Sequence, residues 1–218
     1  MINLEEMSAF FAARVDGYDE HMLQNVAGCR AGYKAMAEHV PSGTRTLLDL
    51  GCGTGLELDE IFKLHPGVEV TGIDMTREML DVLKAKYKNK NITLLCGDYF
   101  EVAFGRERYN CAVSFQTMHH FTHDRKRELY ARVRDALCDG GVYIECDYMA
   151  KTQEEEELHF SALDKMRREL SLEGGTFYHY DTPCTVENQI KLLYSAGFSS
   201  VDQVFSEAST VMLVAKKT

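Results

Sequence analysis

The stretch Leu47-Leu48-Asp49-Leu50-Gly51-Cys52-Gly53-Thr54-Gly55-Leu56 carries the strongest structural signal in this chain. A short aliphatic run leads into three glycines at alternate positions, and a helical pattern begins at Leu56. Glycines in such a turn allow a ligand to lie close to the backbone, and the N-terminus of the following helix points amide groups at it. The stretch therefore predicts a ligand site at the carboxyl end of a buried strand.

Two classes of cofactor compete for this glycine-rich turn. A dinucleotide-binding turn has glycines at its first, third and sixth positions, whereas here they occupy the first, third and fifth, and the sixth residue is Leu56. Asp49 precedes the first glycine by two residues, where its carboxylate would repel a pyrophosphate and suit an ammonium group. The residues favour a cationic ligand, and a turn without any ligand is the alternative.

The rest of the chain alternates between strand-like and helical patterns. Aliphatic or β-branched runs cover residues 46–50, 68–73, 92–96, 109–114 and 141–146, and helical patterns cover 56–65, 76–88 and 124–137. Such alternation predicts a parallel sheet with helices on both faces. Two last runs, 198–205 and 209–215, have a short connection and predict an antiparallel hairpin. The expected fold is α/β and Rossmann-like, with seven mostly parallel strands, one antiparallel strand and an N-terminal helical cap.

The segments outside this rhythm suggest two domains. Residues 1–40 are expected to form two helices of an N-terminal cap or lid, ended by Pro41-Ser42-Gly43. Residues 41–218 are expected to form the Rossmann-like domain, with a helical insertion near 151–184. The long charged pattern over 151–172 predicts a helix that Gly174-Gly175 ends, and residues 185–196 predict another. Thr76 is expected to cap the 76–88 helix.

Composition narrows the function classes. The 218 residues are 45% hydrophobic and carry a formal net charge of −10, so a folded core is expected, and nucleic acid is a disfavoured partner. None of the seven cysteines forms a CxxC pair, which predicts reduced thiols in the cytoplasm. Cys96, Cys111 and Cys146 lie in apolar runs and are expected to be buried. No signal peptide, transmembrane helix or membrane partner is expected.

Three loops together resemble the class I S-adenosylmethionine-dependent methyltransferases. The family's first motif, an acidic residue followed by any residue and GxGxG, matches Asp49 through Gly55. The second loop, Gly72-Ile73-Asp74-Met75, follows the second strand, and Cys96-Gly97-Asp98-Tyr99 follows the third. Loops at the carboxyl ends of strands are where open α/β sheets bind ligands. The resemblance covers residues 44–148 most closely.

The resemblance implies S-adenosylmethionine as cofactor, S-adenosylhomocysteine as product, and a role for each loop. Asp74 would bind both ribose hydroxyls, Met75 would pack on adenine, and Asp98 would accept from the adenine amino group. Asp49 would lie near the ammonium side of the methionine moiety, and Tyr18 would cover the cofactor. The cofactor-binding residues implied are Tyr18, Asp49, Gly51, Cys52, Gly53, Gly55, Asp74, Met75, Asp98, Tyr99 and Gln116.

The loop after the fourth strand, Ser114 to Phe121, holds the candidate catalytic residues His119 and His120. In the family this loop lines the methyl-transfer centre, and histidine can act as a base near neutral pH. Simple packing of the loop and contact with the substrate are alternatives. With His123 nearby a metal site is conceivable, but the loop itself offers no carboxylate or thiolate, so no metal is expected.

The leading hypothesis is a methyltransferase that acts on a small molecule by in-line displacement. The N-terminal segment 10–19, Asp147-Tyr148-Met149 and the aromatic residues 177–180 are expected to select the acceptor. An RNA or protein methyltransferase, a non-catalytic S-adenosylmethionine-binding module and a nicotinamide oxidoreductase are the alternatives. The acceptor, the atom that is methylated and the oligomeric state are not encoded in any motif.

Overall fold

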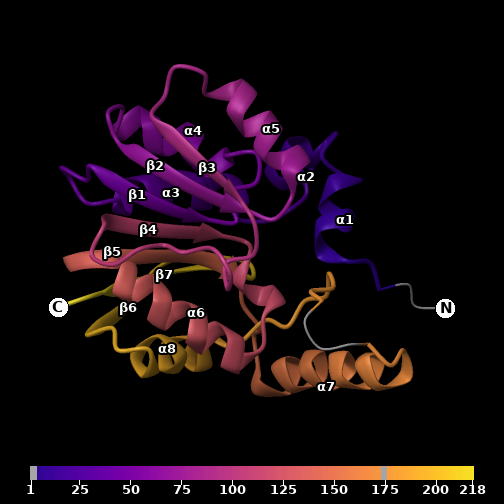
Figure 1. The fold of residues 1–218 in the computed structure, drawn as a ribbon. Helices are drawn as coiled ribbons and strands as arrows, with labels where there is room; N and C mark the ends of the chain where they lie inside the picture. Colours follow the sequence, from indigo (N-terminus) through magenta and orange to yellow (C-terminus); the bar gives the residue numbers. More distant parts are fainter. Residues whose placement is uncertain (1–3, 173–175) are drawn as a thin grey trace.

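The computed structural model describes residues 4–172 and 176–218 and contains a single mixed sheet (Figure 1). Its strands are β1 (Thr46–Leu50), β2 (Glu69–Asp74), β3 (Ile92–Cys96), β4 (Tyr109–Phe115), β5 (Leu137–Tyr148), β6 (Ser200–Glu207) and β7 (Thr210–Lys216). The helices are α1 (Met7–Ala12), α2 (Tyr18–Gln24), α3 (Cys29–His39), α4 (Leu56–Leu64), α5 (Arg77–Lys86), the short 3-10 helix η1 (Met118–His120), α6 (His123–Ala136), α7 (Gln153–Glu169) and α8 (Val186–Ser195).

The strand order is β3-β2-β1-β4-β5-β7-β6. Strands β1 to β5 pair in parallel, whereas β7 runs antiparallel to both β5 and β6. This arrangement confirms the predicted Rossmann-like sheet with one antiparallel strand next to an edge. Because β1 lies beside β4 and β2, the chain changes direction across the sheet at β1, and the loops that follow β1 and β4 diverge there.

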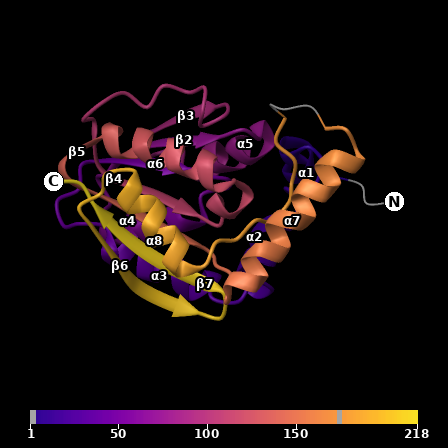
Figure 2. The ribbon, with the colours of Figure 1, turned by 90° about the horizontal axis from the view of Figure 1, so that it is seen from below.

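Successive residues of the central strands point to opposite faces of the sheet and enter two separate cores. In β4, Cys111 and Val113 pack with α3, α4 and α5, whereas Ala112 packs with α6 and α8. Figure 2 shows α6 and α8 side by side on the second face. Burial on both faces explains why the strands read as apolar runs rather than as alternating patterns.

The N-terminal segment differs from its expected organisation, because residues 4–40 contain three short helices rather than two. Its third helix, α3, contributes Cys29, Tyr33 and Met36 to the first core, so it is one of the layers of the sheet domain. The breaks after α1 and α2 contain Gly17 and Gly28, both with positive φ, which divide the segment. Within residues 4–172 and 176–218, no helix has the length and apolarity that crossing a bilayer requires.

Three other local expectations concerned the cap of α5, the burial of three cysteines and the end of the long helix. Thr76 occupies the N-cap position of α5, but its hydroxyl makes no capping bond; its backbone amide instead donates to Asp74. Cys96 is exposed because it ends β3 at the edge of the sheet, whereas Cys111 and Cys146 are buried as expected. The predicted stop of the long helix at Gly174-Gly175 lies outside the described residues.

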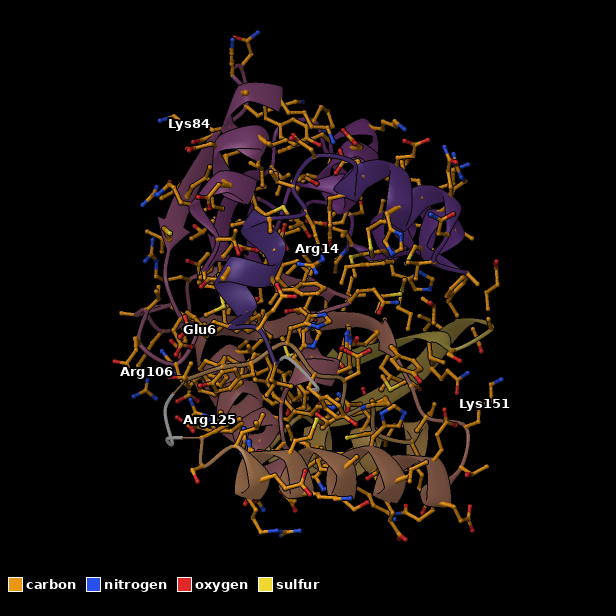
Figure 3. The ribbon with its side chains drawn as sticks, turned by 90° about the vertical axis from the view of Figure 1, so that its right-hand side faces the viewer. Glu6, Arg14, Lys84, Arg106, Arg125 and Lys151 are labelled. Atoms are coloured by element: carbon orange, nitrogen blue, oxygen red, sulfur yellow. The ribbon has the colours of Figure 1, made fainter. Side chains whose placement is uncertain are left out.

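Helix α7 and the segment that returns from it bring the N-terminus to the carboxyl edge of the sheet. The amide of Met7 donates to the carbonyl of Phe177 (2.9 Å), and the amide of His179 donates to the carbonyl of Glu5 (2.9 Å). Figure 3 shows α1 in the middle of this face and α7 along its lower edge. These bonds place α1 over the ends of β1 and β4.

Candidate functional site

The glycine-rich turn after β1 packs against the end of β2. The amides of Gly51 and Cys52 both donate to the carbonyl of Ile73, at 2.8 and 3.2 Å. Gly51 has φ +71°, and a Cβ there would lie 2.6 Å from the Tyr99 hydroxyl and 2.7 Å from Thr117 Oγ1. Glycine is required at this position both for its conformation and for the space.

Asp74 lies opposite this turn at the end of β2. Its carboxylate accepts from the amide of Gly53 (3.0 Å) and from the amide of Thr76 (2.8 Å). Burial raises the pKa of Asp74, and these backbone donors oppose that shift. One carboxylate thus links the glycine turn to the start of α5.

A small cleft of about 40 Å³ lies between the turn, Asp74 and the N-terminal helices. The predicted cofactor residues that line it are Tyr18, Gly51, Gly53, Asp74, Met75, Tyr99 and Gln116. Further lining comes from Met7, Phe11, Met79, Phe115, Thr117 and His120. The predicted residues outside its lining are Asp49, Cys52, Gly55 and Asp98.

Asp49 lies beneath the glycine turn and is fully buried. Neither of its carboxylate oxygens has a hydrogen-bond partner among the described residues. Burial raises the pKa of Asp49 well above its usual range, and the nearby Glu57 adds to the shift. Burial also raises the pKa of Glu57, to about 7. The turn therefore covers two buried acidic residues, Asp49 and Glu57. In the described part of the chain, neither forms an ion pair with a positively charged side chain.

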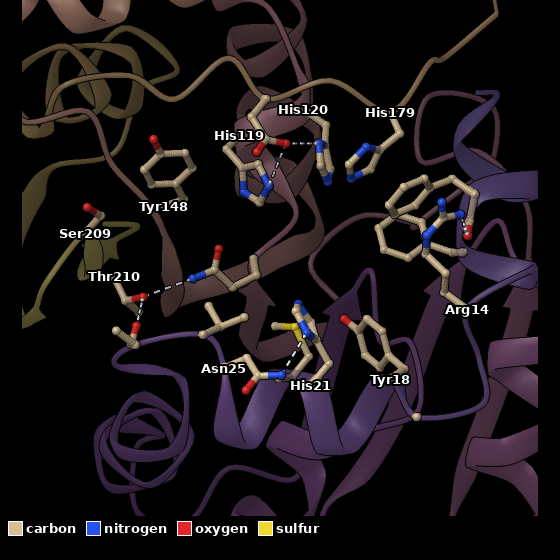
Figure 4. A pocket seen from close by; sticks show the side chains of 18 of the residues that line it. Arg14, Tyr18, His21, Asn25, His119, His120, Tyr148, His179, Ser209 and Thr210 are labelled. Carbon is tan, nitrogen blue, oxygen red and sulfur yellow. Dashed lines mark hydrogen bonds and ion pairs between the residues drawn. The ribbon is translucent and has the colours of Figure 1, made fainter. Parts of the chain in front are cut away.

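A large cavity of about 810 Å³ adjoins the cleft (Figure 4). Four residues, Phe11, Tyr18, Gln116 and His120, line both spaces. His119, His120 and His179 form one wall of the cavity in Figure 4, and Tyr18, His21 and Asn25 from α2 and the following turn lie opposite. A ligand in the cavity would thus meet one in the cleft at the end of β4.

His119 is held by Asp147 at the end of β5. Asp147 Oδ1 lies 2.5 Å from His119 Nδ1, and Asp147 Oδ2 accepts from the His119 amide at 2.9 Å. Burial alone would lower the pKa of His119, but the Asp147 carboxylate outweighs it and the pKa is raised. Since Nδ1 faces Asp147, Nε2 points toward the cavity side of the ring.

His120 and His119 both face Asp181, which follows α7 in the sequence. Asp181 Oδ1 lies 3.4 Å from His120 Nδ1 and 3.6 Å from His119 Nε2. Burial lowers the pKa of His120, and burial together with the other histidines lowers that of His179 to about 4. The ring of His179 stacks on Phe10 with centroids 3.5 Å apart, so part of the predicted aromatic segment does line the cavity.

Sequence reasoning missed Asp181 and the partnership of His119 with Asp147. No local motif signals either contact, because the partners lie 28 and about 60 residues apart in the chain. It also missed Thr210, whose hydroxyl accepts from Gln116 Nε2 (3.1 Å) and donates to the carbonyl of Ala27 (2.7 Å). Gln116 itself has φ +52°, an unusual conformation for a non-glycine residue.

A family model described as a methyltransferase domain matches residues 47–141. This span contains the glycine turn, Asp74 and both loop histidines. Over these residues the chain is similar to the class I S-adenosylmethionine-dependent methyltransferases. The family uses S-adenosylmethionine as its methyl donor, which confirms the cofactor expected from the sequence.

Three known proteins illustrate what this chain is similar to. Malonyl-[acyl-carrier protein] O-methyltransferase of Priestia megaterium is 29% identical over 92 residues, 41% of this chain and 33% of that protein, so the chain spans only a third of its length. Carboxy-S-adenosyl-L-methionine synthase of Helicobacter pylori is 25% identical over 185 residues, 79% of this chain and 74% of that one. The structure of DhpI with S-adenosylhomocysteine has a TM-score of 0.71 at 17% identity, covering 96% of this chain and 94% of that chain, and shows a common fold.

The residues around the cleft fit this cofactor. The carboxyl oxygens of Asp49, which have no hydrogen-bond partner among the described residues, are available to an ammonium group. The Asp74 carboxylate lines the cleft, where it could bind a vicinal diol. Gly51 and Gly53 give access to the backbone. The cleft is much smaller than the 300–1,000 Å³ or so typical of ligand sites. Because Met7, Phe11 and Tyr18 form part of its wall, α1 and α2 are the elements whose movement would enlarge it.

Proposed function

We propose that this chain transfers the methyl group of S-adenosylmethionine to a small molecule held in the large cavity. The observation that carries the proposal is the shared wall of Phe11, Tyr18, Gln116 and His120 between the cleft and the cavity. A donor in the cleft and an acceptor in the cavity would meet there. The size of the cavity, about 810 Å³, suits a small organic acceptor.

The chain's own residues would act mainly by positioning and by excluding water. Bound S-adenosylmethionine supplies a methyl group already activated by its sulfonium centre. Asp74 and the glycine turn would orient the ribose and the methionine moiety, and Asp49 would face the ammonium group. Phe11 and Tyr18 would close the junction against water, and holding two reactants in line accounts for much of such a reaction's acceleration.

The predicted catalytic residues His119 and His120 stay a proposal. Both are more than nine-tenths buried, and both belong to the cavity wall. Their position in the cavity wall supports contact of both histidines with the acceptor. The small-molecule acceptor, the cytoplasmic location and the absence of a nucleic-acid partner likewise stay predictions.

A second candidate function comes from the Helicobacter pylori relative, whose name describes synthesis of carboxy-S-adenosyl-L-methionine and which matches most of this chain. In that case S-adenosylmethionine would itself gain a carboxyl group from a second substrate that carries one, and the remainder of that substrate would leave as a by-product. Both functions require the same cleft, so they differ in the product and not in the binding of the cofactor.

Calorimetric titration with S-adenosylmethionine, S-adenosylhomocysteine and NAD tests the proposal first. We expect micromolar binding of the first two and none of NAD. Mass spectrometry of reactions with hydroxylated, aminated and carboxyl-bearing small molecules then separates the candidates. S-Adenosylhomocysteine and a methylated acceptor support methyl transfer, and a carboxylated S-adenosylmethionine supports the second function. Binding of the cofactor without turnover of any acceptor would favour a non-catalytic module.

A further inference from the structure

The wall of the large cavity holds three side chains that converge on one point: His119, His120 and Asp181, called here the His–His–Asp trio. One ligand atom from each lies within 4.8 Å of the others. Asp181 Oδ1 is buried and accepts no hydrogen bond from the described residues, although His120 Nδ1 and His119 Nε2 lie at 3.4 and 3.6 Å. Three donor atoms thus face one another, and no hydrogen bond from the described residues occupies Asp181 Oδ1.

The surrounding structure orients these side chains as the supporting residues of metal sites do. Asp147 accepts from His119 Nδ1, which leaves the Nε2 lone pair directed away from Asp147 and toward Asp181. Metal-binding histidines commonly make this bond to a carboxylate through the nitrogen that does not bind the metal. The carboxylates of Asp147 and Asp181 form ion pairs only with histidines in the described part of the chain.

The segment that carries Asp181 is fixed to the histidine loop by its neighbour Thr182. The Thr182 amide and hydroxyl both donate to the carbonyl of His119, at 2.6 and 3.0 Å, and the hydroxyl also reaches the carbonyl of Phe121 at 3.3 Å. Thr182 is fully buried. These bonds fix the segment that carries Asp181 against the histidine loop, although the two are about 60 residues apart in the sequence. The geometry of the trio is therefore held by buried hydrogen bonds.

We propose that the His–His–Asp trio binds a divalent transition-metal ion in the acceptor cavity. Two imidazoles and one carboxylate are the ligands that Zn²⁺, Fe²⁺, Co²⁺ and Mn²⁺ share, and three protein ligands leave positions open on the side of the cavity. The carbonyl of Tyr180 also lies 3.4 Å from His120 Nδ1. When the ion binds, it would replace the proton that Nδ1 shares with this carbonyl. The sequence argument against a metal, the missing carboxylate, does not hold once Asp181 is beside the loop.

The site also indicates the class of acceptor, and this part rests on the proposed function. A molecule with a hydroxyl group next to a second oxygen donor would occupy two open positions of the ion. Binding to the ion lowers the pKa of the hydroxyl group, whose proton passes to water. The new oxygen–methyl bond forms as the methyl–sulfur bond breaks, and the electron pair of that bond remains on sulfur.

Titration of the full chain with Co²⁺, after dialysis against a chelator, tests the site. We expect visible absorption bands that saturate at one ion per chain and that Zn²⁺ abolishes. D181N and H120Q should each bind Co²⁺ at least about tenfold more weakly. H123Q is the matched control and should bind normally, since His123 belongs to a different group with Glu156 and Cys184. Circular dichroism of each variant checks its fold.

Three results would overturn the metal site: Co²⁺ binding that D181N and H120Q do not weaken, an intense thiolate band that H123Q removes, or absence of Co²⁺ binding. The metal-free protein is titrated with S-adenosylmethionine in parallel. Failure to bind that ligand counts against the proposed function alone, whereas normal binding without Co²⁺ binding counts against the metal site alone.

Discussion

The two halves of the site are built in different ways. In the proposed cofactor half, the sheet contributes segments at or just after strand ends: the glycine turn after β1, Asp74 at the end of β2 and Tyr99 after β3. The acceptor half brings together α1 and α2, the loop after β4, the segment after α7 and the start of β7. The first half depends on local sequence and the second on long-range contacts, so damage to each should have separable effects.

The largest effect is expected for Gly51→Ala in the cofactor half. Its Cβ would overlap the Tyr99 hydroxyl, and its positive φ would be strained, so we expect a loss of about 1–3 kcal/mol in stability and of most cofactor binding. Chemical denaturation and calorimetry measure the two. Gly140→Ala is the matched control, because Gly140 has φ +74° but open space at its Cβ.

A double variant sharpens this test. Tyr99→Phe removes the hydroxyl that the new Cβ would meet at 2.6 Å, so Gly51→Ala combined with Tyr99→Phe should be more stable than Gly51→Ala alone. If Gly51→Ala loses no more stability than Gly140→Ala, steric overlap at the turn is not what requires glycine.

Asp74→Ala should affect the cofactor half alone. Loss of two hydrogen bonds to a ribose diol is expected to cost about 1.5–3 kcal/mol, or roughly tenfold or more in affinity for S-adenosylmethionine. Calorimetry gives the affinity. Asp98→Ala provides a comparison, because Asp98 lies outside the lining of the cleft and bonds the Phe100 amide. Equal affinity of Asp74→Ala and the parent protein would refute the ribose assignment.

Thr182→Val should damage the acceptor half alone. The variant keeps the shape of the side chain but leaves the carbonyl of Phe121 without its bond from the Thr182 hydroxyl, which should cost about 1–2 kcal/mol of stability. Thermal unfolding measures the loss, and affinity for S-adenosylmethionine should stay near the parent value. A parallel fall in that affinity would show that the two halves are coupled.

The smallest expected effect is a release of protons on cofactor binding. Burial raises the pKa of Asp49 and so favours its protonated form, whereas an ammonium group beside it would favour the ionised form. Binding should therefore release protons, and affinity should rise with pH. Calorimetry in buffers of different ionisation enthalpy measures the release. Asp49→Asn should abolish it, and an unchanged release in that variant would place the titrating group elsewhere.

The same contrast explains what could be predicted from the sequence. Parallel strands end at one edge of a sheet, so the positions of Asp74 and Tyr99 followed from their places after two strands. Asp181 could not be found in this way, because its approach to His120 depends on how α7 and the returning segment pack. The three-helix division of residues 1–40 was missed for a related reason: the core contacts of α3 are with strands far along the chain.

The shared wall of Phe11 and Tyr18 has a kinetic consequence. Both residues line the narrow cleft and the open cavity, so an acceptor that occupied the cavity first would hinder the movement by which α1 and α2 admit the cofactor. Turnover would then follow a compulsory order, with S-adenosylmethionine entering first and S-adenosylhomocysteine leaving last. A lid of this kind makes product escape, rather than the chemical step, a natural limit on the rate.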